Sequence, residues 1–199
     1  MERQPESKSK EISYNSQRAG KGLSVAVYIR RDGRPSCNIF FEIYDYQLYE
    51  KRVKEMIRNV RSEDAQALVS ICKTALFHET DSVTMKRRIQ ELSLNDSYYI
   101  AVYEDDNDHR VLGFIQAERY NLLYAGNGWN IIALAVDPEA QRHGIGKKLL
   151  NALEEKASDD QYTFIRLNCN IIREKAHVFY QSMGYICDKT QKRFIKEIN

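Results

Sequence analysis

Four segments of the chain repeat apolar residues every three or four positions, the spacing that gives a helix one buried face. The segments are 62–76, 82–92, 144–157 and 173–183. Ser62 is a suitable N-cap for the first helix, and Gly184 ends the fourth. In the third, Ile145, Leu149 and Leu153 share one face. The pattern therefore predicts four amphipathic helices.

Runs rich in β-branched, aliphatic and aromatic residues lie between these helices and predict strands. They are 56–60, 98–103, 111–120, 130–136 and 162–167, with one or two closing strands in 185–195. The run at 130–136 (NIIALAV) is apolar almost throughout, as in a central strand buried on both faces. The order of elements indicates an α+β (mixed α/β) fold, with a central mixed sheet of about seven strands flanked by helices.

The first 55 residues predict an extension of that fold. Residues 1–22 are polar and predict a flexible tail. Strand-like runs at 25–30 and 38–44 flank a turn signal, Asp32 and Gly33, and predict a β-hairpin, followed by a polar helical link. A two-stranded hairpin is only marginally stable alone. We therefore expect the hairpin unit (23–55) to pack on the main domain (56–199) or on the second subunit of a homodimer.

Charge and composition narrow the classes of function. The chain has 30 Lys and Arg against 28 Asp and Glu, a net charge of +2, which argues against a general nucleic-acid binder. No apolar run reaches the roughly 18 to 20 residues that span a bilayer, and the N-terminus has no apolar signal region. The four cysteines are far apart and form no CxxC pair. We therefore expect a cytoplasmic protein without membrane partner, metal site or disulfide framework.

The stretch QRHGIGKKLL (141–150) places two glycines at the start of the third predicted helix. It lacks the GxxxxGK[ST] pattern of a P-loop and the third glycine of a dinucleotide-binding GxGxxG turn. The residues alone leave two interpretations open. The glycines let the helix pack tightly on the sheet, or their amides cradle an anion at the helix N-terminus, helped by Arg142, His143 and Lys147.

This stretch and its surroundings resemble the GNAT superfamily of N-acetyltransferases. VDPEAQRHGIG resembles motif A, AHVFYQSMGY (176–185) resembles motif B, and MIRNVRSEDAQALVSI resembles the first strand and helix of that family. The two motifs stand in the family's order, and the resemblance covers 56–199. The C-terminal part is most similar to acetyltransferases of small amines, including aminoalkylphosphonate acetyltransferases.

The resemblance implies acetyl-CoA as the acetyl donor, with no metal. The diphosphate of acetyl-CoA would lie on the backbone amides of Gln141, Arg142, His143, Gly144, Ile145, Gly146 and Lys147. Its pantetheine arm would pair, in the manner of a strand, with Leu134, Ala135 and Val136. A backbone amide of this strand would stabilise the oxyanion.

Two side chains are predicted to be catalytic. Tyr180 matches the motif B tyrosine that protonates the leaving CoA thiolate, and a phenol with a pKa near 10 keeps its proton at pH 7. Its alternative role is that of a core aromatic. Many relatives carry a glutamate on the strand before motif A, but residues 130–133 include no carboxylate. Glu118 is the predicted general base, and His78, Glu79 or a water chain are the alternatives.

These features predict an N-acetyltransferase that moves an acetyl group to the primary amine of a small molecule in a ternary complex. A protein N-terminal or lysine acetyltransferase is the alternative enzyme. A non-catalytic acyl-CoA-binding sensor domain is the alternative from another class, favoured by the missing glutamate and disfavoured by Tyr180. Arg173 stands where many relatives have an asparagine that contacts the CoA arm, so that contact is not expected of it.

Overall fold

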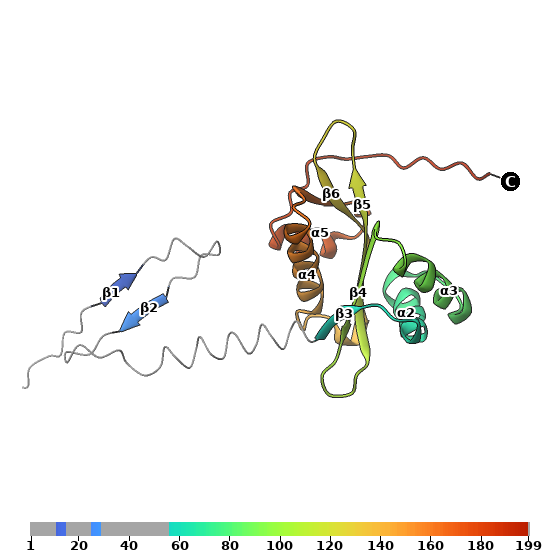
Figure 1. Cartoon of the computed structure of the whole chain (residues 1–199), viewed down its shortest axis with the longest axis horizontal. Helices are drawn as coiled ribbons and strands as arrows, with labels where there is room; N and C mark the ends of the chain where they lie inside the picture. The colour runs from blue at the N-terminus through green and yellow to red at the C-terminus, as the bar shows by residue number, and fades with distance from the viewer. Residues whose placement is uncertain (1–10, 15–24, 29–55, 199) are drawn as a thin grey trace, which may run out of the picture. The chain divides into compact units, whose positions relative to one another are not determined.

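The computed structural model describes residues 11–14, 25–28 and 56–198, and it describes side-chain surroundings from residue 56 onward (Figure 1). The chain divides into two units, at Val53 and Lys54, and each is considered by itself.

The first unit contains a two-stranded antiparallel sheet of β1 (Glu11–Tyr14) and β2 (Val25–Tyr28). Strand β2 falls within the predicted strand at 25–30. Its partner strand differs from the prediction: β2 pairs with β1, which belongs to the segment 1–22 predicted to be a flexible tail. The predicted second strand of the hairpin, 38–44, lies outside the described residues.

The second unit is built on a five-stranded mixed sheet. In spatial order its strands are β3 (Ile57–Asn59), β4 (Tyr98–Glu104), β5 (Val111–Asn121), β6 (Asn127–Val136) and β7 (Phe164–Leu167). Neighbouring strands are antiparallel, except that β6 and β7 are parallel. The mixed sheet is thus confirmed, with five strands in this unit instead of about seven.

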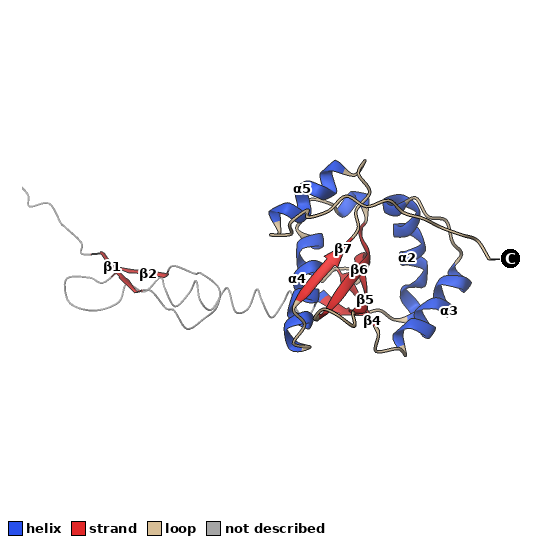
Figure 2. Cartoon of the chain, turned by 90° about the horizontal axis from the view of Figure 1, so that it is seen from above, coloured by secondary structure: helices blue, strands red, loops and turns tan. Residues whose placement is uncertain are grey.

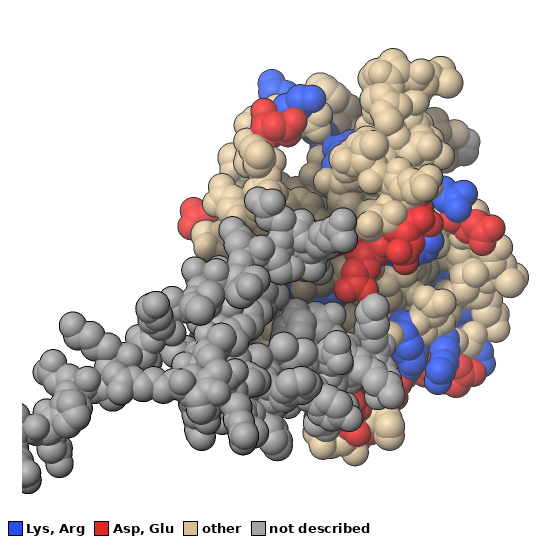
Figure 3. Space-filling view, turned by 60° about the vertical axis from the view of Figure 1, so that its left-hand side comes forward, with Lys and Arg blue, Asp and Glu red and all other residues tan. Residues whose placement is uncertain are grey.

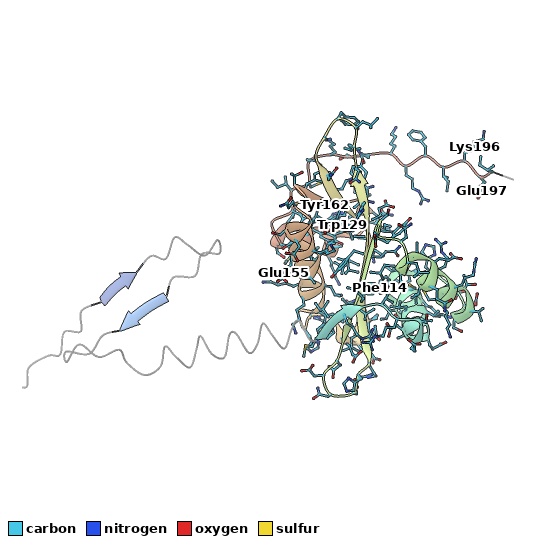
Figure 4. All side chains as sticks on the ribbon, viewed as in Figure 1. Phe114, Trp129, Glu155, Tyr162, Lys196 and Glu197 are labelled. Carbon is cyan, nitrogen blue, oxygen red and sulfur yellow. The ribbon has the colours of Figure 1, made fainter. Side chains whose placement is uncertain are left out.

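The predicted closing strands are absent from residues 185–198, which the structure describes as irregular chain. Ile186 and Phe194 are each 88% exposed there, and Figure 4 shows the labelled Lys196 and Glu197 far from the sheet. A run with strand propensity becomes a strand only when a neighbouring strand takes up its backbone groups. Residues 185–198 include runs with strand propensity, but none of the described strands pairs with them.

The four predicted helices are confirmed. They are α2 (Ala65–Ile71), α3 (Ser82–Ser93), α4 (Ile145–Asp159) and α5 (Glu174–Ser182). A 3₁₀ turn (Ser62–Asp64) leads into α2, a π-helical turn, η2 (Cys72–Leu76), follows it, and a 3₁₀ turn (Pro138–Ala140) precedes α4. Figure 2 shows α2 and α3 on one face of the sheet, and α4 with α5 on the other.

Alternation along the strands divides the core into two clusters, one on each face of the sheet. Trp129 and Tyr162 belong to the α4 cluster, and Phe114 to the cluster beneath α2 and α3, as the labels in Figure 4 show. Helix α4 contributes Leu149 and Leu153, both 0% exposed. Burying one leucine stabilises a fold by about 1.5 to 3 kcal/mol, so this helix is firmly held.

Helix α4 lies close to the sheet because β5 has a glycine beneath it. A Cβ atom at Gly113 would lie 2.9 Å from the carbonyl oxygen of Ala135 and 3.2 Å from Ile145. The close approach of helix and sheet is therefore made possible by a strand glycine, which the sequence pattern did not single out.

An ion network anchors the edge strand β3. The Nη1 and Nη2 atoms of Arg58 donate to the two carboxylate oxygens of Asp64, each at 2.8 Å, and its Nε donates to Glu104 at 2.5 Å. Burial alone would raise the pKa of Asp64, but the bonds from Arg58 and from the Arg61 amide outweigh it and lower that pKa. The network joins β3 to the start of α2 and the end of β4.

Candidate active site

The central strand β6 loses its outer partner halfway along its length. It pairs with β7 only over Gly128–Ile131, whereas its pairing with β5 continues to Val136. The change of register next to Ala117 leaves Ile132 as an extra residue in β6, 48% exposed. Among the described residues no strand pairs with the outer edge of β6 beyond Ile131. This open edge includes the predicted pantetheine contacts Leu134, Ala135 and Val136.

Beyond β6 the chain turns into α4 without a side-chain cap. The Asp137 carboxylate caps the short 3₁₀ turn by accepting from the Glu139 amide at 3.0 Å. The N-cap of α4 is Gly144, with φ 78° and ψ 3°, and no side chain accepts from the first amides of the helix. The uncapped amides of a helix N-terminus attract anions.

The structure argues against tight packing as the reason for the two glycines of this turn. A Cβ built on Gly144 has no atom within 4 Å, so the glycine serves its left-handed backbone conformation. A Cβ on Gly146 would lie 3.5 Å from the ring of Phe179 in α5, an ordinary van der Waals contact. The space in front of Gly144 is open, as a ligand that approaches the backbone requires.

The basic residues of the turn point in different directions. Arg142, His143 and Lys147 are exposed, whereas Lys148 is half-buried and its Nζ lies 3.3 Å from the hydroxyl of Tyr103. On the face seen in Figure 3, acidic and basic side chains each appear in several separate groups. At the turn itself, the exposed basic or titratable side chains are those of Arg142, His143 and Lys147.

Tyr180 lies on the α4 side of the sheet, half-buried between the rings of Phe179 and Tyr185, whose centroids are 5.2 and 5.9 Å away. Burial raises the pKa of Tyr180 to about 12, with a further contribution from Cys169 and an opposing one from Arg173. Its hydroxyl therefore keeps its proton at pH 7 and can donate it.

Glu118 lies on the opposite face of the sheet, in contact with Asn130 of β6. Its Oε1 accepts from the Nδ2 of Asn130 on β6 at 2.9 Å. The alternative bases are less well placed, because His78 and Glu79 are exposed and Glu79 pairs with Lys73 at 3.2 Å. A carboxylate is thus present beside β6, supplied by the neighbouring strand β5.

Tyr180 and Glu118 lie on opposite faces of the sheet. Tyr180 packs against the core cluster beneath α4, whereas Glu118 lies opposite Asn130 on the other face. Asn130 belongs to the stretch of β6 that pairs with β7, next to the open edge that begins at Ile132. The sheet thus carries a phenol on one face and a carboxylate on the other.

Three features of the site were missed in the sequence. The Nη2 of Arg173 donates to the carbonyl oxygen of Ala75 at 3.0 Å and so joins α5 to η2. His177 contacts the carbonyl oxygen of Asn170 at 3.0 Å and steadies the start of α5. The pairing of Asn130 with Glu118 follows the register of the hairpin that joins β5 to β6, which starts at Asn121 and Asn127, and strand alternation alone gives no signal for that register.

Among the described residues, no group of three or more His, Cys, Asp or Glu side chains is arranged to hold a metal ion. None of the helices described has the length and apolar character required to cross a membrane.

Comparison with known proteins identifies the family. The model of the acetyltransferase (GNAT) family matches residues 56–185, which is more than half of the chain. The chain belongs to the GNAT acetyltransferase family. The domain is therefore an acyltransferase, and acetyl-CoA is the donor that the family uses. No curated protein sequence matches the chain.

Solved structures share the fold of this GNAT domain. Glucosamine-6-phosphate N-acetyltransferase from Arabidopsis thaliana has a TM-score of 0.60 at 18% identity, over 71% of this chain and 97% of that one. An aminoglycoside 6′-N-acetyltransferase from Acinetobacter haemolyticus has a TM-score of 0.61 at 13% identity, over 72% and 99%. A transcriptional regulator from Bacillus halodurans has a TM-score of 0.63 at 18% identity, over 70% and 98%. At these identities the likeness concerns the fold alone.

Proposed function

We propose that the protein is an acetyl-CoA-dependent N-acetyltransferase of small primary amines that works by direct attack in a ternary complex. The proposal rests on two backbone features that follow each other along the chain, an open strand edge and an uncapped helix N-terminus. The outer edge of β6 is open from Ile132 to Val136, and the N-terminus of α4 that follows it is uncapped at Gly144. One surface suits the amides of a pantetheine arm, and the other suits a diphosphate.

The residues present fit acetyl-CoA along this path. Gly144 leaves room in front of the helix amides, and Arg142, His143 and Lys147 add exposed basic or titratable groups. The amides of Gln141 to Lys147 would hold the diphosphate. The backbone of Leu134, Ala135 and Val136 would hold the arm, with an amide of Leu134 or Ala135 stabilising the oxyanion.

The side chains divide the proton transfers between the two faces of the sheet. Glu118, oriented by Asn130, takes the proton that the acceptor amine loses when it attacks the acetyl carbonyl. Tyr180 donates its phenolic proton to the sulfur of the departing CoA. The raised pKa of Tyr180, about 12, keeps that proton available at neutral pH. Attack then needs no covalent acetyl-enzyme.

The acceptor is assigned to small molecules on the resemblance of motif B to that of small-amine acetyltransferases. Two of the structural neighbours are named for amino-sugar and aminoglycoside acetylation, which agrees with this assignment without extending to the acceptor of this chain.

The test combines binding and turnover in one sample. Thermal unfolding of the full chain is measured with and without acetyl-CoA, and free-thiol release is then followed against a panel of amines. Ligand at about 100 times its Kd stabilises by about 2.7 kcal/mol, which for a chain of this size raises Tm by roughly 5 to 10 °C. A rise with amine-dependent thiol release supports the proposal. A rise without release for any amine favours a sensor domain, and no rise rejects the acetyl-CoA site.

A further inference from the structure

One row of side chains crosses four strands of the sheet on the face that carries α2 and α3. The register places Tyr98 of β4 opposite Glu118 of β5, Glu118 opposite Asn130 of β6, and Asn130 opposite Arg166 of β7. Directly opposed residues in a sheet project their side chains to the same face. Four polar or aromatic side chains therefore form one continuous line, here called the polar row.

The polar row lies outside the hydrophobic core. The next row toward α2 and α3 contains Ile100 and Ala133, which pack against the core cluster on that face, and no member of the polar row belongs to that cluster. Figure 1 shows β5 and β6 continuing beyond the level of α2 and α3. All four side chains of the row are half-buried, so the row is sheltered by its neighbours and still accessible.

The middle of the row, Glu118 and Asn130, presents hydrogen-bond acceptors. The Nδ2 of Asn130 donates to Glu118, which leaves the Oδ1 of Asn130 buried and without a partner among the described residues. Buried polar atoms are nearly always satisfied in native proteins. The group that satisfies this oxygen must be a donor, and beside a carboxylate the best donor is an amine or ammonium group.

The β7 end of the row presents a fixed cation, Arg166. The guanidinium carbon of Arg166 lies 4.7 Å from the ring centroid of Tyr120, and its Nη2 donates to the Oδ1 of Asn168 at 2.9 Å. Among the described residues no carboxylate lies within salt-bridge distance of Arg166. A guanidinium held by an aromatic ring and one amide keeps other N–H groups for two oxygens of a carboxylate or of a phosphate-type anion.

We infer that the acceptor is a small amine that also carries an anionic group, a carboxylate, phosphate or phosphonate. Its amine lies at Glu118 and Asn130, and its anion lies at Arg166. Adjacent strands are about 4.8 Å apart, so the α-carbons of Glu118 and Arg166 are separated by about 10 Å, which long side chains reduce to the span of a small molecule. The inference rests on the proposed function and adds the acceptor class. An acceptor with a second cation in place of the anion would be repelled by Arg166.

The test compares acceptors that differ only in the anion. The rate constant kcat/KM is measured for glucosamine 6-phosphate against glucosamine, and for 4-aminobutyrate against 4-aminobutyramide. We expect the anionic member of at least one pair to be preferred by about 10- to 100-fold, the range of a charged hydrogen bond. The pair that shows the preference distinguishes phosphate from carboxylate recognition.

Three variants assign the preference to its residue. Arg166→Gln is expected to abolish it, and Arg166→Lys to restore part of it. Arg119→Gln removes the same charge from an exposed residue of β5 on the opposite face and is expected to keep it. Equal use of both members of each pair, or the same loss in Arg119→Gln as in Arg166→Gln, rejects the inference.

A binding measurement separates failure of the inference from failure of the proposed function. Tm is measured with glucosamine 6-phosphate or 4-aminobutyrate while saturating CoA occupies the anion site at α4. If no amine is acetylated but either compound raises Tm in the parent chain and not in Arg166→Gln, the polar row is a ligand site and the proposed function fails. If neutral amines are acetylated better than their anionic counterparts, the proposed function stands and the inference is overturned.

Discussion

Helices α3 and α4 begin in opposite ways, although each must satisfy the free amides of its first turn. At α3 the Asp81 carboxylate accepts from the amides of Val83 and Thr84, both at 2.9 Å. At α4 the N-cap is Gly144 in a left-handed conformation, with no side chain on the amides. A carboxylate cap stabilises a helix and also fills the place where an anion would bind. The comparison separates a helix whose first amides are capped by its own side chain from one whose first amides have no side-chain cap.

Two other described helices also begin without a side-chain cap, so the missing cap alone does not distinguish α4. The N-cap of α2 is Asp64, whose carboxylate is bound by Arg58 and the Arg61 amide and not by the first amides of the helix. The N-cap of α5 is Arg173, and no side chain caps that helix either. Helix α4 differs from both because its N-cap is a glycine in the left-handed conformation, with open space where a side chain would begin.

The largest effect is expected from placing a carboxylate on α4. Gly144→Glu should weaken acetyl-CoA binding by about 1,000-fold, because charged hydrogen bonds contribute about 1.5 to 3 kcal/mol each and two or more would be lost. Isothermal titration at fixed ionic strength measures the Kd, and circular dichroism verifies the fold.

Gly144→Ala is the matched control for that variant. It carries the same unfavourable φ, at about 1 to 2 kcal/mol, without the charge. We expect its Kd to rise by about tenfold or less. Acetyl-CoA affinity in Gly144→Glu within tenfold of that in Gly144→Ala would show that charge at this position is irrelevant, and the contrast with Asp81 would fail.

Much of this comparison was accessible from sequence. The helical spacing predicted α4 to within two residues at its C-terminal end, and the resemblance of QRHGIG to motif A located the anion turn. The reason for a glycine at position 144 could not be predicted from the sequence. Tight packing and a bound ligand both favour glycine, and only the structure shows that the space in front of this residue is open. The partner of Glu118 could not be predicted either, since the register of the hairpin between β5 and β6 sets which side chains face each other.

The second-largest effect concerns Asp64, a carboxylate whose hydrogen-bond donors come from the protein itself. Asp64→Asn should lower the free energy of unfolding by about 3 kcal/mol, because it leaves the Arg58 guanidinium buried with one of its two carboxylate partners. Urea unfolding at pH 7 measures the loss. The matched control is Asp108→Asn, which removes a carboxylate from an exposed turn and should leave the midpoint unchanged.

The pH dependence of that loss follows from the lowered pKa of Asp64. The unfolded chain binds its proton near pH 4, and the folded chain binds it only at lower pH. The stabilisation by Asp64 is therefore complete above about pH 4 and disappears as the pH falls through the folded-state pKa. The difference between the parent chain and Asp64→Asn should shrink in acid; a constant difference down to pH 2 would contradict the assignment.

The third effect separates binding at α4 from chemistry at α5. Tyr180→Phe should reduce kcat by about 100-fold, within the usual range for loss of a general acid, and leave the Kd for acetyl-CoA unchanged. Thiol release and titration measure the two quantities. Tyr185→Phe is the control, because Tyr185 packs against Tyr180 at 5.9 Å without an assigned role in proton transfer. Equal losses in both variants would make Tyr180 a packing residue.

The smallest effect comes from removing the side-chain cap of α3. Asp81→Ala should lower Tm by about 2 to 4 °C, as expected for an N-cap in a chain of this size, and leave acetyl-CoA affinity unchanged. Hydrogen bonds from Thr84 and Val83 lower the pKa of Asp81, so its contribution is present above about pH 4 and lost at lower pH. Asp81→Asn retains a capping side chain and should recover most of the Tm at pH 7. The contrary outcome is that Asp81→Ala binds CoA or diphosphate at α3 with an affinity comparable to that of α4. Any uncapped helix N-terminus of this protein would then be enough to bind the anion. The open edge of β6 and the turn at Gly144 would have no special part in binding.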